Sequence, residues 1–310
     1  MDQSELRKLI AIVGPTAVGK TDLAIDLAVV LGTEVVSADS RQFFRELVIG
    51  TAKPSATQLS TVRHHFVNHL SIFDEYDAAK FEAEALKVLE GIFVKSSNAV
   101  LVGGSGLYVD AVVRGLSEIP QVPVGLREEL NQEVATHGLS GLLEELRGAD
   151  PACYESIDRQ NHSRVIRAIG VIRTSGKPYS SFLGGSKRFD RPFSTIKIGL
   201  SMDRAELYAR IDARMDEMLE AGLVEEARSL RPHADLNALQ TVGYAEIFPY
   251  LDGTYDHQEA VRLLKRNSRR YAKRQLTWFR KDPEITWFEP GQRKAIHEFV
   301  KTRLDTKNFD

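Results

Sequence analysis

Residues 14–21 have the types and spacing needed to hold a phosphate group. Their sequence, Gly-Pro-Thr-Ala-Val-Gly-Lys-Thr, matches the pattern G-x-x-x-x-G-K-[ST] in full. Glycines let backbone N–H groups converge on phosphate oxygens, and the helix that follows adds a favourable dipole. Lys20 supplies a mobile positive charge, and the Thr21 hydroxyl is suited to ligate Mg²⁺. The motif predicts a diphosphate or nucleotide held by Gly14, Pro15, Thr16, Ala17, Val18, Gly19, Lys20 and Thr21.

Short apolar runs alternate with helical patterns around this loop. Three of the runs have the composition of buried parallel strands, namely residues 8–14, 33–39 and 98–104. Such alternation predicts right-handed crossovers and a parallel sheet, whose ligand sites lie beyond the carboxyl ends of its strands. We therefore expect Gly14–Thr21, Ser37–Gln42 and Gly103–Tyr108 to lie together at one edge of the sheet.

The character of the chain changes near residue 115. A linker-like stretch, IPQVPVG, leads into residues with helix-capping signals and no clear strand pattern up to about residue 190. A strand pattern returns at 194–202, and helical patterns follow it. The predicted fold class is α/β, with a P-loop NTPase-like parallel sheet core interrupted by a helical domain. The predicted bounds are 1–115 and 193–310 for the core with its C-terminal helices, and 116–192 for the insertion.

Composition narrows the class further. The chain has 310 residues, of which 43% are hydrophobic and 27% charged, with a net charge of −2. A single cysteine, Cys153, excludes an internal disulfide and a cysteine-rich zinc site, which fits a reducing cytoplasm. The apolar run at the start is too short for a signal sequence or a membrane span. We expect a cytoplasmic protein without membrane attachment, in the monomeric state.

The phosphate loop does not define the reaction. A P-loop kinase or ATPase also needs an aspartate near Mg²⁺ after another apolar strand. Residues 98–104 are followed by Ser-Gly-Leu-Tyr instead, but Asp39 follows the apolar run at 33–39 and could take that place. On spacing alone, Asp39 is a Mg²⁺-associated carboxylate, as a kinase requires, or a helix cap.

Several further segments resemble the tRNA dimethylallyltransferase family. In chain order they are Ser37-Ala-Asp-Ser-Arg-Gln42, Ile49-Gly-Thr-Ala-Lys-Pro54, Gly103-Gly-Ser-Gly-Leu-Tyr108, Arg210-Ile-Asp-Ala-Arg214, Val242-Gly-Tyr244 and Tyr271-Ala-Lys-Arg-Gln-Leu-Thr-Trp-Phe-Arg280. The resemblance spans roughly residues 8–290, and members fold as a P-loop core with a helical insertion. It implies transfer of a dimethylallyl group from dimethylallyl diphosphate to N6 of a tRNA adenosine, the one immediately 3′ of the anticodon.

The resemblance also implies roles for three catalytic side chains. Adenine N6 is a poor nucleophile, and a carboxylate is too weak a base to deprotonate it beforehand. Asp39 would accept the proton while the N–C bond forms and the nitrogen becomes acidic. Arg214 would stabilise the departing diphosphate together with Lys20 and Mg²⁺, although a solvated helix arginine is the alternative. Thr16 would place its hydroxyl at the reacting centre, or else stabilise the turn.

A basic segment near the C-terminus indicates a nucleic-acid partner independently of the family. Nine basic residues and no acidic one lie between Arg262 and Lys281. Arg262, Arg266, Arg269 and Lys273 share one helical face. A basic face on a chain of net charge −2 suits a phosphate backbone. The alternative is a solvated helix surface, although such surfaces normally mix signs.

The resemblance implies contacts to tRNA from the core and from the insertion. In the insertion, Arg164 and Arg167 match an R-x-x-R element, but Asn161 replaces the usual aspartate and Ser163 an often-found glutamine. In the core, Asp39–Gln42 and Gln240–Tyr244 are expected to contact the target base and its neighbours. The full set is Asp39, Ser40, Arg41, Gln42, Ser105, Arg127, Arg164, Arg167, Gln240, Thr241, Val242, Gly243, Tyr244, Arg266, Arg270, Lys273 and Arg274.

Three other functions fit part of the sequence. An adenylate isopentenyltransferase acting on free AMP, ADP or ATP would share the chemistry but not need the basic face or the R-x-x-R element. A P-loop small-molecule kinase would share the phosphate loop and transfer a phosphoryl group. A non-enzymatic RNA-binding P-loop protein would be indifferent to loss of the Asp39 carboxylate.

Overall fold

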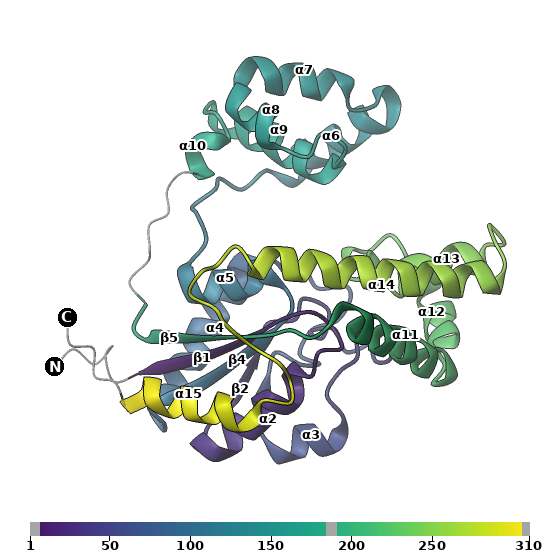
Figure 1. Cartoon of the computed structure of the whole chain (residues 1–310). Coiled ribbons are helices and arrows are strands. Elements are labelled where there is room, and N and C mark those ends of the chain that lie inside the picture. The colour runs from purple at the N-terminus through teal and green to yellow at the C-terminus, as the bar shows by residue number, and fades with distance from the viewer. Residues whose placement is uncertain (1–6, 184–190, 306–310) are drawn as a thin grey trace. The chain divides into compact units, whose positions relative to one another are not determined.

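The computed structural model describes residues 7–183 and 191–305, and the chain divides into two compact units (Figure 1). The core unit consists of Met1–Arg114 and Asp190–Asp310, and the inserted unit is Gly115–Phe189. Each unit has its own buried apolar cluster. In the described part of the chain, no helix combines the length and apolar character needed to cross a membrane.

A six-stranded parallel sheet forms the centre of the core unit. The strands are β1 (Lys8–Val13), β2 (Val35–Ser37), β3 (His64–His65), β4 (Asn98–Gly103), β5 (Ser194–Leu200) and β6 (Thr286–Phe288), in the spatial order β3-β2-β4-β1-β5-β6. Every neighbouring pair is parallel. β1 lies between β4 and β5 and is buried along its whole length. The predicted α/β class with a parallel P-loop-type sheet is confirmed.

Helices cover both faces of this sheet, as Figure 1 shows. The helices of the core unit are α2 (Lys20–Leu31), α3 (Ala56–Thr61), α4 (Ala78–Phe93), α5 (Gly106–Arg114), α11 (Arg204–Glu220), α12 (Leu223–Leu230), α13 (Tyr244–Leu251), α14 (His257–Phe279) and α15 (Arg293–Asp305), with short 3₁₀ turns at Arg231–His233 and Asn237–Leu239. α2 and α15 bury Leu23, Leu27 and Ile296 against one face. α4 and α5 pack on the other face, with Phe81 among their buried side chains. Sandwiching the sheet in this way is what makes its strands apolar on both sides.

α14 is the longest helix of the core unit and borders the site. The Asp256 side chain begins it by accepting a hydrogen bond from the Glu259 N–H. Its buried positions include Leu264, Ser268 and Gln275, spaced as one stripe. The helix packs on α11, α13 and α5. One face of α14 therefore contacts the core while its remaining surface carries the basic side chains.

The inserted unit is helical throughout its described residues. It contains α6 (Val124–His137), α7 (Ser140–Ala149), α8 (Pro151–Ser156), α9 (His162–Ser175) and α10 (Ser180–Leu183). Asp150, which is almost completely buried, accepts hydrogen bonds from the Cys153 N–H and from both the N–H and the hydroxyl of Ser180. This one carboxylate fixes the start of α8 to the start of α10.

Candidate active site

The carboxyl ends of β1, β2 and β4 lie side by side, so the segments that follow them meet at one edge of the sheet. The Ser40 N–H donates a 3.0 Å hydrogen bond to Ser105 Oγ, and the two hydroxyls are 3.2 Å apart. A Cβ at Gly103 would lie 2.2 Å from the Ala38 carbonyl oxygen. Only glycine allows this approach, which brings the segment after β4 against the segment after β2.

The phosphate loop joins β1 to α2. Gly14 and Gly19 have φ of 147° and 96°, and Ala17 also has a positive φ of 64°. Lys20 Nζ donates a 2.6 Å hydrogen bond to the Pro15 carbonyl across the loop. Burial lowers the pKa of Lys20 to about 8, partly opposed by the nearby Asp39. Lys20 and Asp39 therefore lie close enough to influence each other.

Asp39 lies two residues after the end of β2 and is half-buried. Its Oδ1 accepts a 3.0 Å hydrogen bond from the Arg41 N–H, an Asx turn that fixes the carboxylate. Among the described residues, Oδ2 has no hydrogen-bond partner. Asp39 caps no helix, because the next helix, α3, begins at Ala56. The arrangement leaves one carboxylate oxygen available beside the phosphate loop.

Arg214 extends from α11 toward the phosphate loop. Its Nη1 approaches Thr16 Oγ1 to 3.5 Å. Burial lowers the pKa of Arg214, opposed by Glu217 and Asp22. Arg210, one turn earlier on the same helix, is exposed and pairs with Glu206. Arg210 therefore faces solvent, whereas Arg214 points toward the site.

The site beside the phosphate loop offers few protein ligands for a metal ion. Within the described residues, no group of three His, Cys, Asp or Glu side chains could hold one. The Thr21 hydroxyl, at the start of α2, remains a single oxygen ligand beside the loop. Mg²⁺ binds readily through one or two protein oxygens plus substrate phosphates and water. The donor set fits an ion that arrives with a diphosphate rather than a permanent metal centre.

Aromatic side chains lie beside Asp39. The Arg41 guanidinium donates a 2.6 Å hydrogen bond to the Asn237 carbonyl and lies near Tyr108 and Tyr271. Burial raises the pKa of the Tyr271 hydroxyl to about 12, and Asp39 acts in the same direction. Sequence reasoning did not assign Tyr271 to the site, although it begins the Tyr-Ala-Lys-Arg-Gln segment. These rings and the guanidinium offer flat surfaces on which a base could stack.

Two residues expected to contact an RNA base, Gln42 and Tyr244, make other contacts in this structure. The Gln42 amide donates to the carbonyls of Thr51 and Ala52, and its oxygen lies 3.3 Å from Ser37 Oγ. The Tyr244 side chain is 0% exposed. The polar atoms of Gln42 are thus occupied and the Tyr244 side chain is buried, while their contact with an RNA base stays a prediction. Both hold the site segments in shape.

The other residues of the connection before α13 are more accessible. Gln240 is exposed, and its amide donates to the Ala234 carbonyl at 2.7 Å. Thr241 and Val242 are half-buried, and the Gly243 N–H donates to Glu246 Oε2. This connection borders the core through Gly243 and presents Gln240 to solvent.

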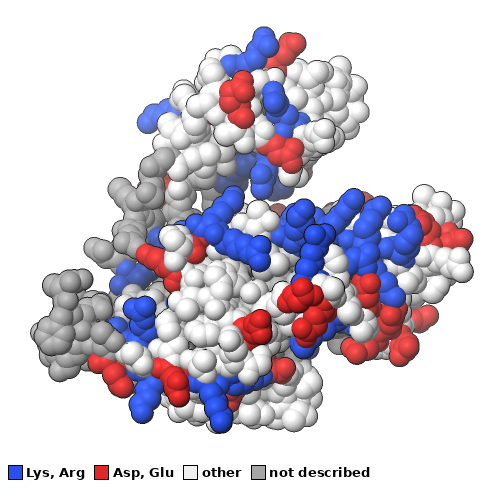
Figure 2. Space-filling view, in the orientation of Figure 1, with Lys and Arg blue, Asp and Glu red and all other residues white. Residues whose placement is uncertain are grey.

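The basic face of α14 contains two kinds of residue. Arg262 pairs with Glu259 on its own helix, while Lys265 and Arg269 pair with Asp216 and Asp212 of α11. The expectation of one unmixed basic face is corrected in this respect, since α11 supplies acidic partners. Figure 2 shows basic side chains gathered over α14, with acidic ones nearby on the same face. Four basic residues have no ion pair within the described chain, namely Arg266, Arg270, Lys273 and Arg274.

In the inserted unit, Arg127 on α6 and Arg164 and Arg167 on α9 are all exposed. Asn161 begins α9, because its side chain accepts a 3.1 Å hydrogen bond from the Arg164 N–H. Asparagine at this position therefore performs the capping that an aspartate would perform. With the cap retained, both arginines lie exposed on the first two turns of the helix.

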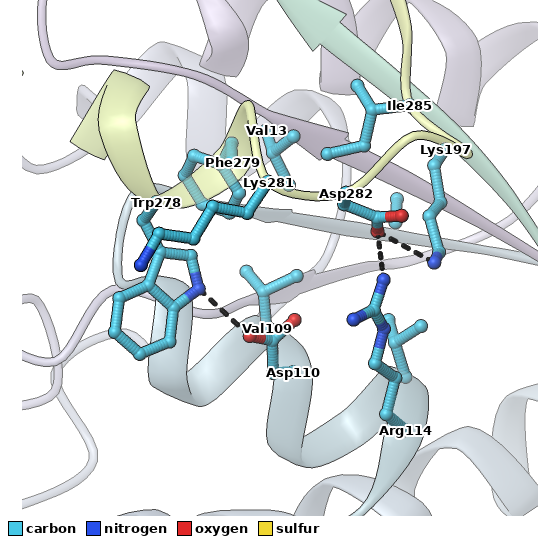
Figure 3. A pocket seen from close by; sticks show the side chains of 12 residues that line it. Val13, Val109, Asp110, Arg114, Lys197, Trp278, Phe279, Lys281, Asp282 and Ile285 are labelled. Carbon is cyan, nitrogen blue, oxygen red and sulfur yellow. Dashed lines mark hydrogen bonds and ion pairs between the residues drawn. The ribbon is translucent and has the colours of Figure 1, made fainter. Parts of the chain in front are cut away.

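A small cavity of about 190 Å³ lies where α5 meets the end of α14 (Figure 3). Its wall includes Val13 and Val109. At its rim, Trp278 Nε1 donates a 2.8 Å hydrogen bond to Asp110 Oδ2. The sequence did not single out this cavity, because its residues come from four separate segments.

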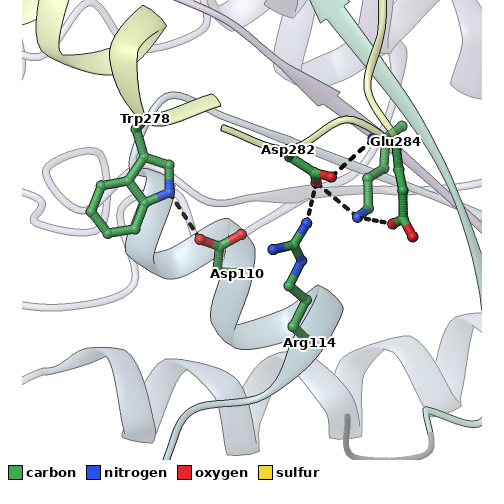
Figure 4. A network of polar contacts seen from close by, with 6 residues as sticks. Asp110, Arg114, Trp278, Asp282 and Glu284 are labelled. Carbon is green, nitrogen blue, oxygen red and sulfur yellow. Dashed lines mark hydrogen bonds and ion pairs between the residues drawn. The ribbon is translucent and has the colours of Figure 1, made fainter. Parts of the chain in front are cut away.

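An ionic network borders this cavity (Figure 4). Asp282 pairs with Arg114 at 2.5 Å and with Lys197 at 2.8 Å, and Lys197 also pairs with Glu284 at 2.6 Å. Burial alone would raise the pKa of Asp282, but the Lys197 hydrogen bond and the nearby positive charges hold it below its ordinary value. The network neutralises a buried lysine of β5 and attaches the segment after α14 to the sheet.

The fold and the site together define a P-loop α/β protein with a carboxylate beside its phosphate loop. The phosphate loop, Asp39 and Arg214 come from three separate parts of the chain and meet at one sheet edge.

The chain belongs to the IPP transferase family, whose model matches residues 42–282. It is 53% identical to a tRNA dimethylallyltransferase of Cytophaga hutchinsonii, over 96% of this chain and 97% of that protein. A second tRNA dimethylallyltransferase, from Christiangramia forsetii, is 48% identical over 96% of this chain and 99% of its own length.

Solved structures agree with this assignment. A full-length tRNA isopentenylpyrophosphate transferase from Bacillus halodurans superposes with a TM-score of 0.71 at 38% identity, covering 97% of this chain and 98% of that chain. A eukaryotic dimethylallyltransferase acting on tRNA shares the fold, with a TM-score of 0.77 at 24% identity over 96% of this chain and 80% of its own.

Proposed function

We propose that this protein transfers a dimethylallyl group from dimethylallyl diphosphate to N6 of the adenosine 3′-adjacent to the anticodon in tRNA. The products are N6-isopentenyladenosine and diphosphate. Family membership supports the proposal. The observation that carries it is the Asp39 carboxylate, which has one oxygen without a partner among the described residues, beside the phosphate loop and the half-buried Arg214.

The proposed reaction exchanges one bond at the allylic carbon. The N6 lone pair forms the new N–C bond while the C–O bond to diphosphate breaks and its electron pair leaves with the oxygen. Asp39 accepts the N6 proton through Oδ2, because Oδ1 is held by the Arg41 N–H. The Asx turn orients the carboxylate before the base arrives, which lowers the entropic cost of reaction.

Charge that develops on the departing diphosphate needs positive partners. The loop N–H groups, Lys20 and Arg214 are those that the site offers, and Thr16 Oγ1 lies against Arg214. Lys20, whose Nζ donates to the Pro15 carbonyl, would turn to the diphosphate when it binds. Mg²⁺, held by Thr21 and the diphosphate, would supply further positive charge when bound.

The acceptor base must leave its stacked loop to reach Asp39. Arg41, Tyr108 and Tyr271 surround the approach and supply stacking surfaces, while Ser40 and Ser105 supply hydroxyls. The unpaired basic residues of α14 would contact the tRNA backbone, as would Arg127, Arg164 and Arg167 of the inserted unit. We further propose that the protein acts as a cytoplasmic monomer.

The test is a parallel incubation of the purified protein and labelled dimethylallyl diphosphate with tRNA or with AMP. We expect label in tRNA alone, recovered as N6-isopentenyladenosine by mass spectrometry. Label in AMP alone would instead identify an adenylate isopentenyltransferase. ATP-dependent phosphoryl transfer with no prenyl product would identify a kinase.

A matched variant tests the role of Asp39. Asp39→Asn keeps an oxygen to accept the Arg41 N–H but cannot take a proton. The value of kcat should fall by a factor on the order of 10²–10⁴, with binding of inorganic diphosphate little changed. A variant as active as wild type would remove the catalytic base from the mechanism.

A further inference from the structure

Gln275 connects two loops that belong to opposite sides of the site. It lies on α14 and is 5% exposed. Its Oε1 accepts a 2.8 Å hydrogen bond from the Thr16 N–H in the phosphate loop. Its Nε2 donates a 3.0 Å hydrogen bond to the Gly104 carbonyl, in the segment after β4. A single side-chain amide therefore spans the two loops and satisfies a backbone group in each.

The surrounding backbone is shaped to admit this side chain. A Cβ at Gly104 would lie 2.3 Å from Gln275 Nε2 and 3.6 Å from the Gly14 carbonyl oxygen. One turn along α14, Trp278 covers Gly106, where a Cβ would lie 2.3 Å from the indole ring. The last turns of α14 thus fit the glycine-rich segment closely, with Gln275 at the point nearest the phosphate loop.

The two hydrogen bonds of Gln275 form a bridge between the loops. Each end of this bridge lies next to a group with a role in the proposed reaction. Thr16, whose N–H is held, presents its hydroxyl to Arg214. Gly104, whose carbonyl is held, is followed by Ser105, which accepts the Ser40 N–H one residue after Asp39. The leaving-group side and the acceptor side of the site are therefore joined through one buried amide.

We propose that Gln275 is a positioning residue that sets the spacing between the diphosphate loop and the loops that hold the acceptor base. The inference rests on the proposed function. Both polar atoms of Gln275 are occupied, so it acts on the substrates through Thr16 and Gly104 and touches neither substrate. Displacement of reacting groups by about 1 Å can lower a rate about a hundredfold. Loss of the bridge would permit such a displacement.

Gln275→Glu provides a signature that a purely structural role would lack. The variant keeps an oxygen for the Thr16 N–H, but an ionised carboxylate cannot donate to the Gly104 carbonyl. Burial raises the pKa of a carboxyl group, and the protonated form can donate again. The ratio of variant to wild-type kcat should therefore rise by about tenfold as the pH is lowered from about 8 to about 6. Titration of Lys20, which is present in both proteins, largely cancels in this ratio.

Gln275→Leu removes both hydrogen bonds while filling similar space. We expect kcat to fall about a hundredfold, with at least ~10-fold weaker binding of inorganic diphosphate, since the Thr16 N–H is no longer held. Leu264→Ala is the control, because Leu264 is fully buried on the same helix two turns or more from the bridge. It should lower the melting temperature but leave kcat and diphosphate binding within about twofold of wild type at a temperature where it is folded.

The outcomes separate the inference from the function on which it rests. Wild-type protein that modifies no tRNA would overturn the proposed function. Active wild type, with folded Gln275 variants that match it in kcat, pH ratio and diphosphate binding, would overturn the positioning role alone. If Gln275→Leu does not fold, the pH ratio of Gln275→Glu decides by itself.

Discussion

The Tyr244 hydroxyl donates a 2.6 Å hydrogen bond to Glu226 Oε1, and the same carboxylate holds the backbone of a separate segment. It accepts the N–H groups of residues 48–50 at 2.8–3.1 Å. The Tyr244 ring also covers Gly50, where a Cβ would lie 2.6 Å from the ring carbon Cζ. Glu226 and Tyr244 therefore set the conformation of the Gly-Thr-Ala-Lys-Pro segment.

Replacing Glu226 by Gln should loosen this segment. The amide keeps one acceptor oxygen but turns an NH₂ group toward backbone N–H groups, leaving donors unsatisfied. We expect a loss of about 1–3 kcal/mol in the free energy of unfolding, measured in urea. The KM for tRNA should rise more than the affinity for inorganic diphosphate falls, since the phosphate loop lies elsewhere.

Tyr244→Phe is the milder companion of this change. It removes one hydrogen bond and keeps the ring on Gly50, so it should cost about 1 kcal/mol. Equal stability and equal tRNA kinetics for Glu226→Gln and wild type would contradict the role assigned to the carboxylate.

The strands that carry the site could be predicted because they are apolar runs followed by glycine or a polar turn. β1 and β4 are such runs, and the glycine pattern after β1 identified the phosphate loop. β3 could not be predicted, because His64 and His65 have no apolar alternation. Its strand conformation depends on pairing with β2, which only the folded chain provides.

Side-chain partners were harder to predict than elements. Helical periodicity places Gln275 on a buried face, but its partner Thr16 is 259 residues away. The same holds for the charges on α14, where Lys265 finds Asp216 on another helix. The sequence of a segment shows its own charged residues, but it does not show which charged residues of other segments pack beside them. The number of basic residues without acidic partners was therefore overestimated, while the position of the basic face in the chain was correct.

Diphosphate binding should weaken as the pH rises above about 8. Burial lowers the pKa of Lys20 to about 8, so Lys20 loses its proton above that value. Binding of diphosphate above this pH requires reprotonation of Lys20. The dissociation constant for diphosphate should therefore rise by up to about tenfold for each unit that the pH rises. Isothermal titration calorimetry with inorganic diphosphate measures this dependence. Lys20→Arg, which keeps its charge, should show only the pH dependence of diphosphate itself, and an identical profile for both proteins would exclude Lys20 as its source.

The unpaired basic residues of α14 should contribute more to tRNA affinity than the paired ones. Arg270→Gln with Lys273→Gln should raise the KM for tRNA several-fold and reduce the slope of log affinity against log salt by roughly one per charge removed. Arg262→Gln is the matched control on the same helix, because Arg262 already pairs with Glu259. Filter binding between about 50 and about 200 mM salt gives both slopes. Equal losses for the control and the double variant would show that pairing does not matter.

The network around Lys197 should contribute to stability in a pH-dependent way. Asp282→Asn leaves the buried Lys197 with Glu284 as its remaining acidic partner, and Glu284 is 50% exposed. We expect a loss of about 3 kcal/mol in the free energy of unfolding, against less than about 1 kcal/mol for Glu284→Gln.

The pKa of Asp282 is held below its ordinary value by Lys197 and the nearby charges, despite burial. Its contribution is therefore complete above the unfolded-state pKa near ~4 and is lost as the pH falls through the lower folded-state value. Urea unfolding across this range should show wild type converging on Asp282→Asn at acid pH, and a constant difference would assign the loss to packing rather than to charge.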